Sequence, residues 1–156
     1  MPTCYILIGV PGSGKSTWIA KAPLDWSNTV VASTDNYVER EAKKQGKTYS
    51  EVFKDTMPAA VNHMADTVRE AVKAGLNIVW DQTSTTKLTR AKKFRMLPPN
   101  YRVVGVVFKT PDQKELTRRL QGRPGKEIPD QVMQSMIRNW EEPTEAEGFD
   151  KIIYAN

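Results

Sequence analysis

The sequence predicts an α/β domain in which a five-stranded parallel sheet carries helices on both faces. Short apolar runs rich in β-branched residues alternate with longer stretches whose apolar residues recur at helical spacing. This alternation is typical of parallel strands joined by helices, because parallel strands need long crossover connections. The length of 156 residues suits one hydrophobic core, and no repeat, low-complexity tract or linker interrupts the chain. We therefore expect a single domain over residues 1–156.

The expected strands are apolar runs that are too short to form helices of their own. The clearest is 102–108, where four valines and Phe108 give the strongest strand signal in the chain. The full set of expected strands is 4–8, 29–33, 76–80, 102–108 and 149–154.

Helix boundaries are expected at capping residues, glycines and prolines. Ser50 can cap a helix that begins at Glu51, Pro58 is expected to restart that helix, and Gly75 is a natural C-cap. Thr110 and Pro111 form a cap-plus-first-turn pair for a later helix that runs through Leu120. The remaining helical stretches are 17–22, a polar stretch ending near Gln45, a basic stretch ending near Leu97, and 132–140.

A glycine-rich loop separates the first strand from the first helix. Residues 9–16 match the pattern G-x-x-x-x-G-K-[ST] at every fixed position, and the strand and helix around them favour nucleotide binding over an ordinary turn. The glycines let successive backbone N–H groups converge on one anion, with the positive end of the helix dipole behind it. Lys15 is expected to reach the β- and γ-phosphates, and the Ser16 hydroxyl to hold Mg²⁺. The nucleotide-binding residues expected here are Gly12, Ser13, Gly14, Lys15, Ser16 and Thr17.

Two aspartates follow strands at the edge where the ligands of parallel sheets gather. Asp35 comes just past the 29–33 run, where its carboxylate can face the γ-phosphate and accept a proton from an acceptor hydroxyl. Asp81 follows the 76–80 run, where it can act as an outer-sphere Mg²⁺ partner or contact the acceptor. Each aspartate can instead cap the helix that follows it, and this alternative stays open for both.

Two arginines stand four residues apart where a predicted helix gives way to glycine and proline. Arg119 lies on the helix, and Arg123 lies in the segment 121–129, which we expect to be mobile. A mobile loop with arginines can exclude water and hold the charge of a transferring phosphate. Surface arginines are the alternative, and the adjacent Arg118 is expected to point elsewhere on the helix.

Several large side chains fit both a core and a binding role. Trp18 and Trp140 match apolar helix faces, so we expect them in the core rather than as stacking platforms for a base. The others can line an acceptor pocket beside Asp35, although core packing explains them equally well. They are Tyr37, Val38, Tyr49 and Phe53.

Charge is distributed unevenly along the chain. The net charge is +5, and residues 87–126 hold twelve basic against two acidic side chains, whereas residues 1–86 hold nine of each. A strongly positive segment suggests a polyanionic partner in addition to the nucleotide. Taken individually, four lysines of this segment are expected to be solvated surface residues. They are Lys87, Lys92, Lys93 and Lys114.

The remaining bulk features narrow the class of protein. No apolar run approaches membrane-spanning length and the first residues lack the features of a signal peptide, so we expect a cytoplasmic protein without a membrane partner. Cys4 is the single cysteine, which excludes an intrachain disulfide, and we expect it in the core. The single histidine, His63, argues against a histidine-based metal site. Nothing in the sequence indicates an oligomeric state.

Together these residues resemble the kinase domain of the bacteriophage-type 5′-polynucleotide kinase family, within the wider P-loop kinase group found among DNA-repair kinases. The matching blocks occur in the family's order over nearly the whole chain. The loop block is generic to P-loop proteins, whereas Asp35-x-Tyr37 and the spacing of the arginines are more discriminating. The blocks are 9–18, 34–37, 81–83 and 115–129.

The resemblance implies a P-loop kinase-type three-layer sandwich with an arginine-bearing lid at about 121–129. It implies transfer of the γ-phosphate of ATP, with Mg²⁺, to the 5′-hydroxyl end of DNA or RNA in nucleic acid repair, in the host cytoplasm if a phage encodes the chain. Lys15 and Ser16 would then handle the phosphates and Mg²⁺, and Asp35 would be the general base. Asp81, with Thr83 of the same block, would help position the acceptor. Arg119 and Arg123 would stabilise the transferring phosphate.

One position departs from this family. The family has an arginine three residues after the base, which holds the acceptor's own phosphate, and here that position is Val38. Arg40 can take the role, but from a different face of the helix. The departure leaves open a kinase of a small hydroxyl compound, such as a nucleoside or sugar derivative. A nucleotide-binding module without catalysis is a third possibility, against which Asp35 and Asp81 argue. The phosphatase domain of the phage enzyme has no room in this length, so we expect no 3′-end processing.

Overall fold

The fold is a five-stranded, all-parallel sheet with the strand order β2-β3-β1-β4-β5. The computed structural model describes all 156 residues. Because β1 lies at the centre of the sheet and its end feeds the glycine-rich loop, that loop sits in the middle of one sheet edge. The expected strand set is confirmed: β1 Thr3–Ile8, β2 Thr29–Ser33, β3 Asn77–Asp81, β4 Arg102–Val107 and β5 Lys151–Tyr154.

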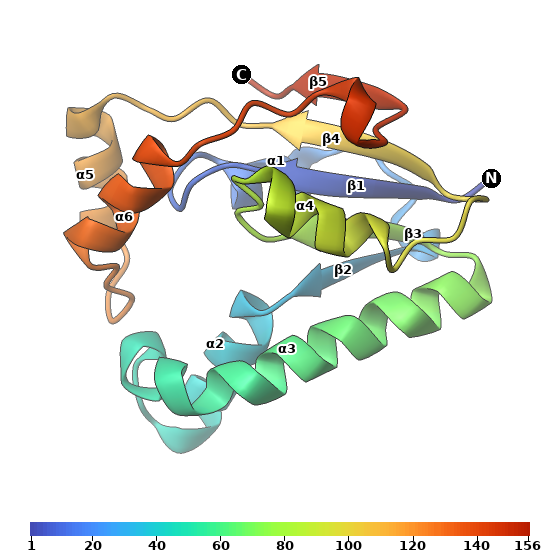
Figure 1. The fold of residues 1–156 in the computed structure, drawn as a ribbon. Helices are drawn as coiled ribbons and strands as arrows, with labels where there is room; N and C mark the ends of the chain where they lie inside the picture. Colours follow the sequence, from blue (N-terminus) through green and yellow to red (C-terminus); the bar gives the residue numbers. More distant parts are fainter.

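Helices connect these strands and form the outer layers. In Figure 1 the long helix α3 crosses below the sheet, and α5 and α6 stand together beyond the ends toward which the strand arrows point. No helix is both long enough and apolar enough to cross a membrane. The helices are α1 Lys15–Lys21, α2 Asp35–Gln45, α3 Tyr49–Ala74, α4 Lys87–Phe94, α5 Gln113–Gln121 and α6 Asp130–Arg138, with short 3₁₀ turns at Trp26–Asn28 and Glu145–Glu147.

The sheet is covered on both faces, as the near-continuous apolar strands predict. On one face, Ile6 and Ile8 pack with Met64 and Val68 of α3 and with the end of α4. On the other face, side chains of β1 and β4 pack against α1. Cys4 is fully buried and Trp140 is partly buried against the first core cluster, so the expected core positions of both are confirmed. Trp18 packs against the second cluster but also lines the cavity over the glycine-rich loop, so it is not a core residue alone.

The start and continuity of α3 differ from the sequence prediction. Thr48, not Ser50, caps the helix, because its hydroxyl accepts from the Glu51 N–H at 3.2 Å while the Glu51 carboxylate accepts from the Thr48 N–H at 2.8 Å. Pro58 does not restart the helix but lies on the exposed side of one continuous 26-residue helix. A buried stripe that includes Val52 and Ala60 on either side of the proline holds the two halves in line. Tertiary packing therefore overrides the local helix-breaking tendency of proline.

Two other boundaries were also placed wrongly. The carboxylate of Asp112 caps α5 by accepting from the Glu115 N–H at 2.9 Å, so Thr110 and Pro111 lie outside the helix. The helix α4 ends at Phe94 rather than near Leu97.

Lys93 is not the solvated lysine that the sequence suggested. Its side chain lies on the face of α4 that meets the sheet, only 7% of the residue is exposed, and its Nζ lies 5.4 Å from the centroid of the Trp80 ring. The apolar stem of lysine can pack on an aromatic ring as a methionine would. Burial lowers the pKa of Lys93 to about 8.

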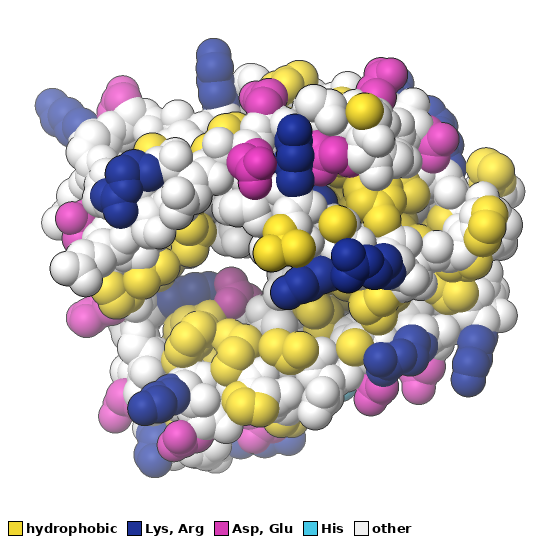
Figure 2. Space-filling view, viewed as in Figure 1, with side chains coloured by type: hydrophobic (Ala, Val, Ile, Leu, Met, Phe, Trp, Pro, Cys, Tyr) yellow, Lys and Arg dark blue, Asp and Glu magenta, His cyan; other side chains and the backbone are white.

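The surface has one marked hollow on the side shown in Figure 2. It lies between the helices α5 and α6 and the beginning of α3, and hydrophobic side chains form both of its rims. Lysine or arginine and acidic side chains are visible at its base. We call this feature the α3–α6 hollow.

Candidate active site

The loop between β1 and α1 has the backbone geometry of a phosphate cradle. Gly12 and Gly14 have φ angles of +83° and +109°, which other residues adopt only with strain. At Gly9, a Cβ would lie 2.5 Å from the Ser13 Oγ and 2.8 Å from the Phe108 Cβ. Each of these three glycines is therefore required by the fold of the loop.

The side chains of the loop fit an anion that is not part of the protein. The Oγ of Ser13 is buried and has no hydrogen-bond partner, so a donor in the cradle lacks an acceptor. The Nζ of Lys15 donates to the carbonyls of Gly9 and Val10 at 2.8 and 3.0 Å. Burial lowers the pKa of Lys15 to about 8, and Asp81 and Asp35 oppose that shift. A phosphate group would give the Ser13 hydroxyl an acceptor and the Lys15 ammonium a negatively charged partner.

A cavity of about 680 Å³ lies over the loop. The predicted nucleotide-binding residues line it together, because they come from the loop and the first turn of α1. Two arginines complete its wall: Arg119 from α5 and Arg123 from the segment that follows this helix. The predicted residues in its lining are Gly12, Ser13, Gly14, Lys15, Ser16, Thr17, Arg119 and Arg123.

Asp35 is the first residue of α2, separated from the end of β2 by Thr34, and its carboxylate does not cap that helix. Instead its Oδ1 accepts from the Tyr49 hydroxyl at 2.5 Å and its Oδ2 accepts from the Lys126 Nζ at 3.1 Å. The N–H of Asn36 is bonded to the Ser33 Oγ at 3.3 Å. The capping alternative is therefore wrong for Asp35. Its side chain is 48% exposed and lies among groups from α3 and the segment 121–129.

Asp81 is the last residue of β3, and it does not cap the following helix, α4. Thr86 caps α4 in a reciprocal arrangement with Thr89. Burial raises the pKa of Asp81, and the nearby Lys15 ammonium opposes this rise. The carbonyl of Thr83 accepts from the Gly9 N–H at 2.9 Å, which fixes the bend after β3 against the phosphate loop. At the end of β3, Asp81 lies within electrostatic range of Lys15.

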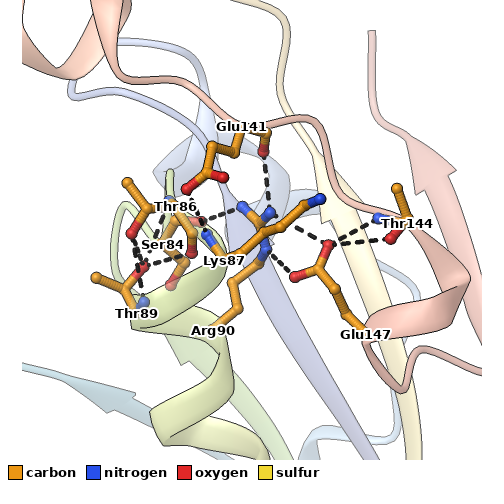
Figure 3. Close-up of polar contacts among 8 residues, drawn as sticks. All are labelled: Ser84, Thr86, Lys87, Thr89, Arg90, Glu141, Thr144 and Glu147. Atoms are coloured by element: carbon orange, nitrogen blue, oxygen red, sulfur yellow. Dashed lines mark hydrogen bonds and ion pairs between the residues drawn. The ribbon is translucent and has the colours of Figure 1, made fainter.

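A buried arginine fixes the bend that follows β3. Figure 3 shows the guanidinium of Arg90 pointing toward Ser84, Glu141 and Glu147. Its Nη1 donates to the Ser84 carbonyl at 2.9 Å, its Nη2 to the Glu141 carbonyl at 2.9 Å and its Nε to the Glu147 Oε1 at 2.8 Å. Ser84 has a φ angle of +48°, unusual for a residue other than glycine. Arg90 is 0% exposed, so it serves the architecture of the bend rather than the basic surface.

Arg119 contacts the phosphate loop directly. Its Nη1 donates to the Gly12 carbonyl at 2.9 Å, and its Nε is bonded to the Glu115 Oε1 at 2.8 Å. Arg118 is paired with the same glutamate at 2.6 Å and does not line the cavity. The expectation that Arg118 points elsewhere is therefore confirmed.

The segment 121–129 is docked on the beginning of α3. The Ser50 N–H donates to the Gly125 carbonyl at 2.9 Å, and the Glu127 N–H donates to the Ser50 Oγ at 2.8 Å. Gly125 has a φ angle of +73°, and a Cβ there would lie 2.8 Å from the Thr48 Cβ. These contacts close the segment over α2 and α3.

Lys126 forms the ion pairs of this closure, and the sequence did not single it out as a site residue. Its Nζ lies 3.1 Å from the Asp35 Oδ2, 3.3 Å from the Glu39 Oε1 and 4.4 Å from the centroid of the Tyr49 ring. Its side chain is 16% exposed. No motif marks Lys126, and its place between Gly125 and Glu127 in the predicted lid was the one available signal.

Two predicted acceptor contacts lie apart from this group. Val38 is fully buried in a small core cluster with Ala42, Val52 and Ala60. The Nη2 of Arg40 lies 3.4 Å from the His63 Nε2, in a separate cavity of about 490 Å³ between α2, α3 and β2. The structure thus groups Asp35 with Tyr49 and Lys126 rather than with Arg40.

This sheet order, together with a phosphate loop between β1 and α1, defines a P-loop domain of the kinase type. The chain belongs to the AAA_33 family, described as an AAA domain, whose model matches residues 5–143.

Solved structures share this fold at low sequence identity. The chain matches a protein of the PezAT toxin–antitoxin system of Streptococcus pneumoniae at 19% identity and a TM-score of 0.73, over 99% of this chain and 66% of that one. It matches a chain of the Pnkp1/Rnl/Hen1 RNA repair complex at 21% identity and a TM-score of 0.67, over 88% of this chain and 43% of that one. It also matches a gluconokinase from Sinorhizobium meliloti at 18% identity and a TM-score of 0.55, over 98% and 81%. The chain therefore spans less than half of the RNA-repair chain and about two thirds of the streptococcal one.

Proposed function

We propose that this P-loop kinase domain transfers the γ-phosphate of ATP to the 5′-hydroxyl end of DNA or RNA. One observation carries the catalytic part of the proposal. The Asp35 carboxylate, which does not cap a helix, accepts from Lys126 of the segment 121–129 and acts electrostatically on the phosphate-loop Lys15. A carboxylate in this relation to a phosphate cradle suits a base that accepts the proton of an acceptor hydroxyl.

Each residue then has a chemical task. Lys15 and the loop N–H groups bind the β- and γ-phosphates, and Ser16 would hold Mg²⁺, which neutralises phosphate charge when bound. Asp35 accepts the proton as the acceptor oxygen forms its bond to the γ-phosphorus and the bond to the bridging oxygen of ADP breaks. Asp81 and Thr83 help position the acceptor. Arg119 and Arg123 stabilise the charge on the transferring group.

A nucleic acid acceptor is favoured by the basic segment 87–126. Arg90 and Lys93 are buried, but other cations of this segment, including Arg118 and Arg123, stay on the surface or at the cavity. The backbone phosphates of a nucleic acid are the natural partners of such cations. The structural likeness to a chain of an RNA repair complex agrees with this choice.

A small hydroxyl compound is the second candidate acceptor. Val38 is buried in the core, so no cation stands where the polynucleotide kinases hold the acceptor's phosphate. The likeness to a gluconokinase agrees with this candidate. A nucleotide-binding module without transfer is the third candidate. The Asp35 carboxylate, which caps no helix and acts electrostatically on the phosphate-loop Lys15, argues against it.

The test offers labelled ATP to the protein with a 5′-hydroxyl oligonucleotide, with a panel of nucleosides and sugars, or with no acceptor. We expect label on the oligonucleotide. Asp35→Asn should abolish this transfer while ATP affinity stays within a few-fold, because the amide keeps the shape but accepts no proton. Label on a small compound alone would show that the acceptor is a small hydroxyl compound and not a nucleic acid end. ATP binding with no transfer at all would overturn the kinase assignment. Collapse of ATP binding in Asp35→Asn would make Asp35 structural or a metal partner.

A further inference from the structure

An aromatic pair on the first turns of α3 adjoins the Asp35 carboxylate. The Tyr49 hydroxyl is bonded to the Asp35 Oδ1 at 2.5 Å, and the Phe53 ring lies one helical turn further along α3. The centroids of the Tyr49 and Phe53 rings are 5.6 Å apart with an interplanar angle of 43°. The span from the carboxylate to Phe53 is thus one tyrosine side chain plus one ring contact.

The two rings of this pair differ in how much of their surface other side chains cover. The Lys126 ammonium covers the Tyr49 ring at 4.4 Å, and Phe53 packs beside the same ring. Phe53 is itself 41% exposed, whereas the other candidates of this region are occupied: Val38 is core and Tyr37 packs on His63 at 5.1 Å. Counted outward from Asp35, Phe53 therefore presents the first free aromatic surface.

Phe53 belongs to the first turns of α3, the part of that helix that borders the hollow (Figure 1). Figure 2 shows hydrophobic side chains on both rims, where α3 faces α6. Exposed apolar residues of these elements are Val61 of α3 and Val132 of α6. A flat group with a π face gains contact energy in such a place, whereas an open-chain polyol would leave its hydroxyls without partners.

We propose that Phe53 stacks on the base of the acceptor's 5′-terminal nucleotide and so selects a nucleic acid end over a sugar. The inference rests on the proposed function, since it names a second part of the proposed acceptor that the protein binds: the base next to the reacting hydroxyl. Stacking of this kind tolerates any base, because every base has a π face.

The first arm of the test measures steady-state kinetics with a 5′-hydroxyl oligonucleotide. Phe53→Ala should raise the acceptor KM roughly tenfold, as stacking of one base on an aromatic residue is worth. The kcat and the KM for ATP should stay unchanged, and Phe53→Trp should behave like the wild type. The matched control is Trp26→Ala, which removes an aromatic residue of similar exposure, 40%, before β2 and away from the hollow.

The second arm removes the base instead of the ring. An oligonucleotide whose 5′-terminal nucleotide is abasic should raise the wild-type KM by a similar factor. Combined with Phe53→Ala it should cause no further loss, because both changes delete the same contact. Additive losses, or no loss in Phe53→Ala with the intact oligonucleotide, would overturn the inference while leaving the proposed function in place. A change of oligomeric state in Phe53→Ala, seen by sedimentation, would make Phe53 a subunit contact instead. Wild-type protein that phosphorylates only small compounds would overturn both.

Discussion

The Nζ of Lys126 lies 3.1 Å from the Oδ2 of Asp35, a contact between residues 91 positions apart in the chain. The Tyr49 hydroxyl occupies the other oxygen of the same carboxylate at 2.5 Å. Both oxygens are thus bonded within the protein, but each keeps a further lone pair and the side chain is 48% exposed, so an acceptor hydroxyl can reach the proposed base beside these partners. Since Lys126 belongs to the segment docked on α3, the contact ties the position of that segment to the proposed base.

The Lys126 contact should hold the segment 121–129 closed. Lys126→Gln removes an ion pair whose Asp35 partner is about half exposed, and such pairs contribute up to about 1 kcal/mol. We expect amide exchange at Ser50 and Glu127, which bond across this closure, to become about two- to fivefold faster. Hydrogen exchange read by mass spectrometry measures this. Lys114→Gln, an exposed lysine of α5, should leave the same amides unchanged.

Much of this site could be predicted because its rules are local. The phosphate loop has a fixed pattern, and Asp35 and Asp81 follow strands whose ends must meet at one edge of a parallel sheet. Helix caps were less certain, because Ser50 and Thr48 are both good caps and only the reciprocal bond with Glu51 selects Thr48.

The remaining features depend on contacts that the local sequence does not encode. Pro58 stays inside α3 because buried residues on both sides of it share one stripe, and Lys93 is buried because α4 turns that face to the sheet. Lys126 meets Asp35 only after the segment 121–129 folds back across α3. Neither periodicity nor a motif marks such a meeting of distant segments.

ATP binding should take up a proton above pH 8. Burial lowers the pKa of Lys15 to about 8 in the free protein, and phosphates favour its charged form. The free protein therefore loses this charge as the pH rises through 8, and ATP affinity should fall roughly tenfold between pH 7 and pH 9. Calorimetry in two buffers of different ionisation enthalpy measures the proton uptake. In Lys15→Arg, whose guanidinium stays charged, both the uptake and the pH dependence should vanish; their persistence would assign them to another group.

The Arg90–Glu147 pair should be among the most sensitive positions for stability. Arg90→Met leaves Glu147 without its cation and strands the carbonyls of Ser84 and Glu141, so we expect a loss of about 3–5 kcal/mol in the free energy of unfolding. Urea unfolding measures it. The double variant Arg90→Met with Glu147→Met should recover part of the loss, because no unpaired charge remains. Arg95→Met, an exposed arginine following the same helix, should cost little. Equal losses in the single and double variants would show that the carbonyl contacts, not the ion pair, matter.

Replacing Lys93 by methionine should stabilise the protein at neutral pH. Methionine keeps the packing on Trp80, and it removes a charge whose burial lowers the pKa of Lys93 from 10.5 to about 8. Below pH 8 both folded and unfolded chains carry the proton, so the full burial cost is present, on the order of 2–3 kcal/mol. Above pH 8 the folded protein releases the proton first, and the wild type regains stability. The advantage of Lys93→Met, measured by urea unfolding, should therefore be largest at pH 7 and shrink toward pH 9.5, whereas the exposed Lys92→Met should show no advantage at either pH. An advantage of Lys93→Met that does not change with pH would mean that packing alone, rather than the buried charge, explains it.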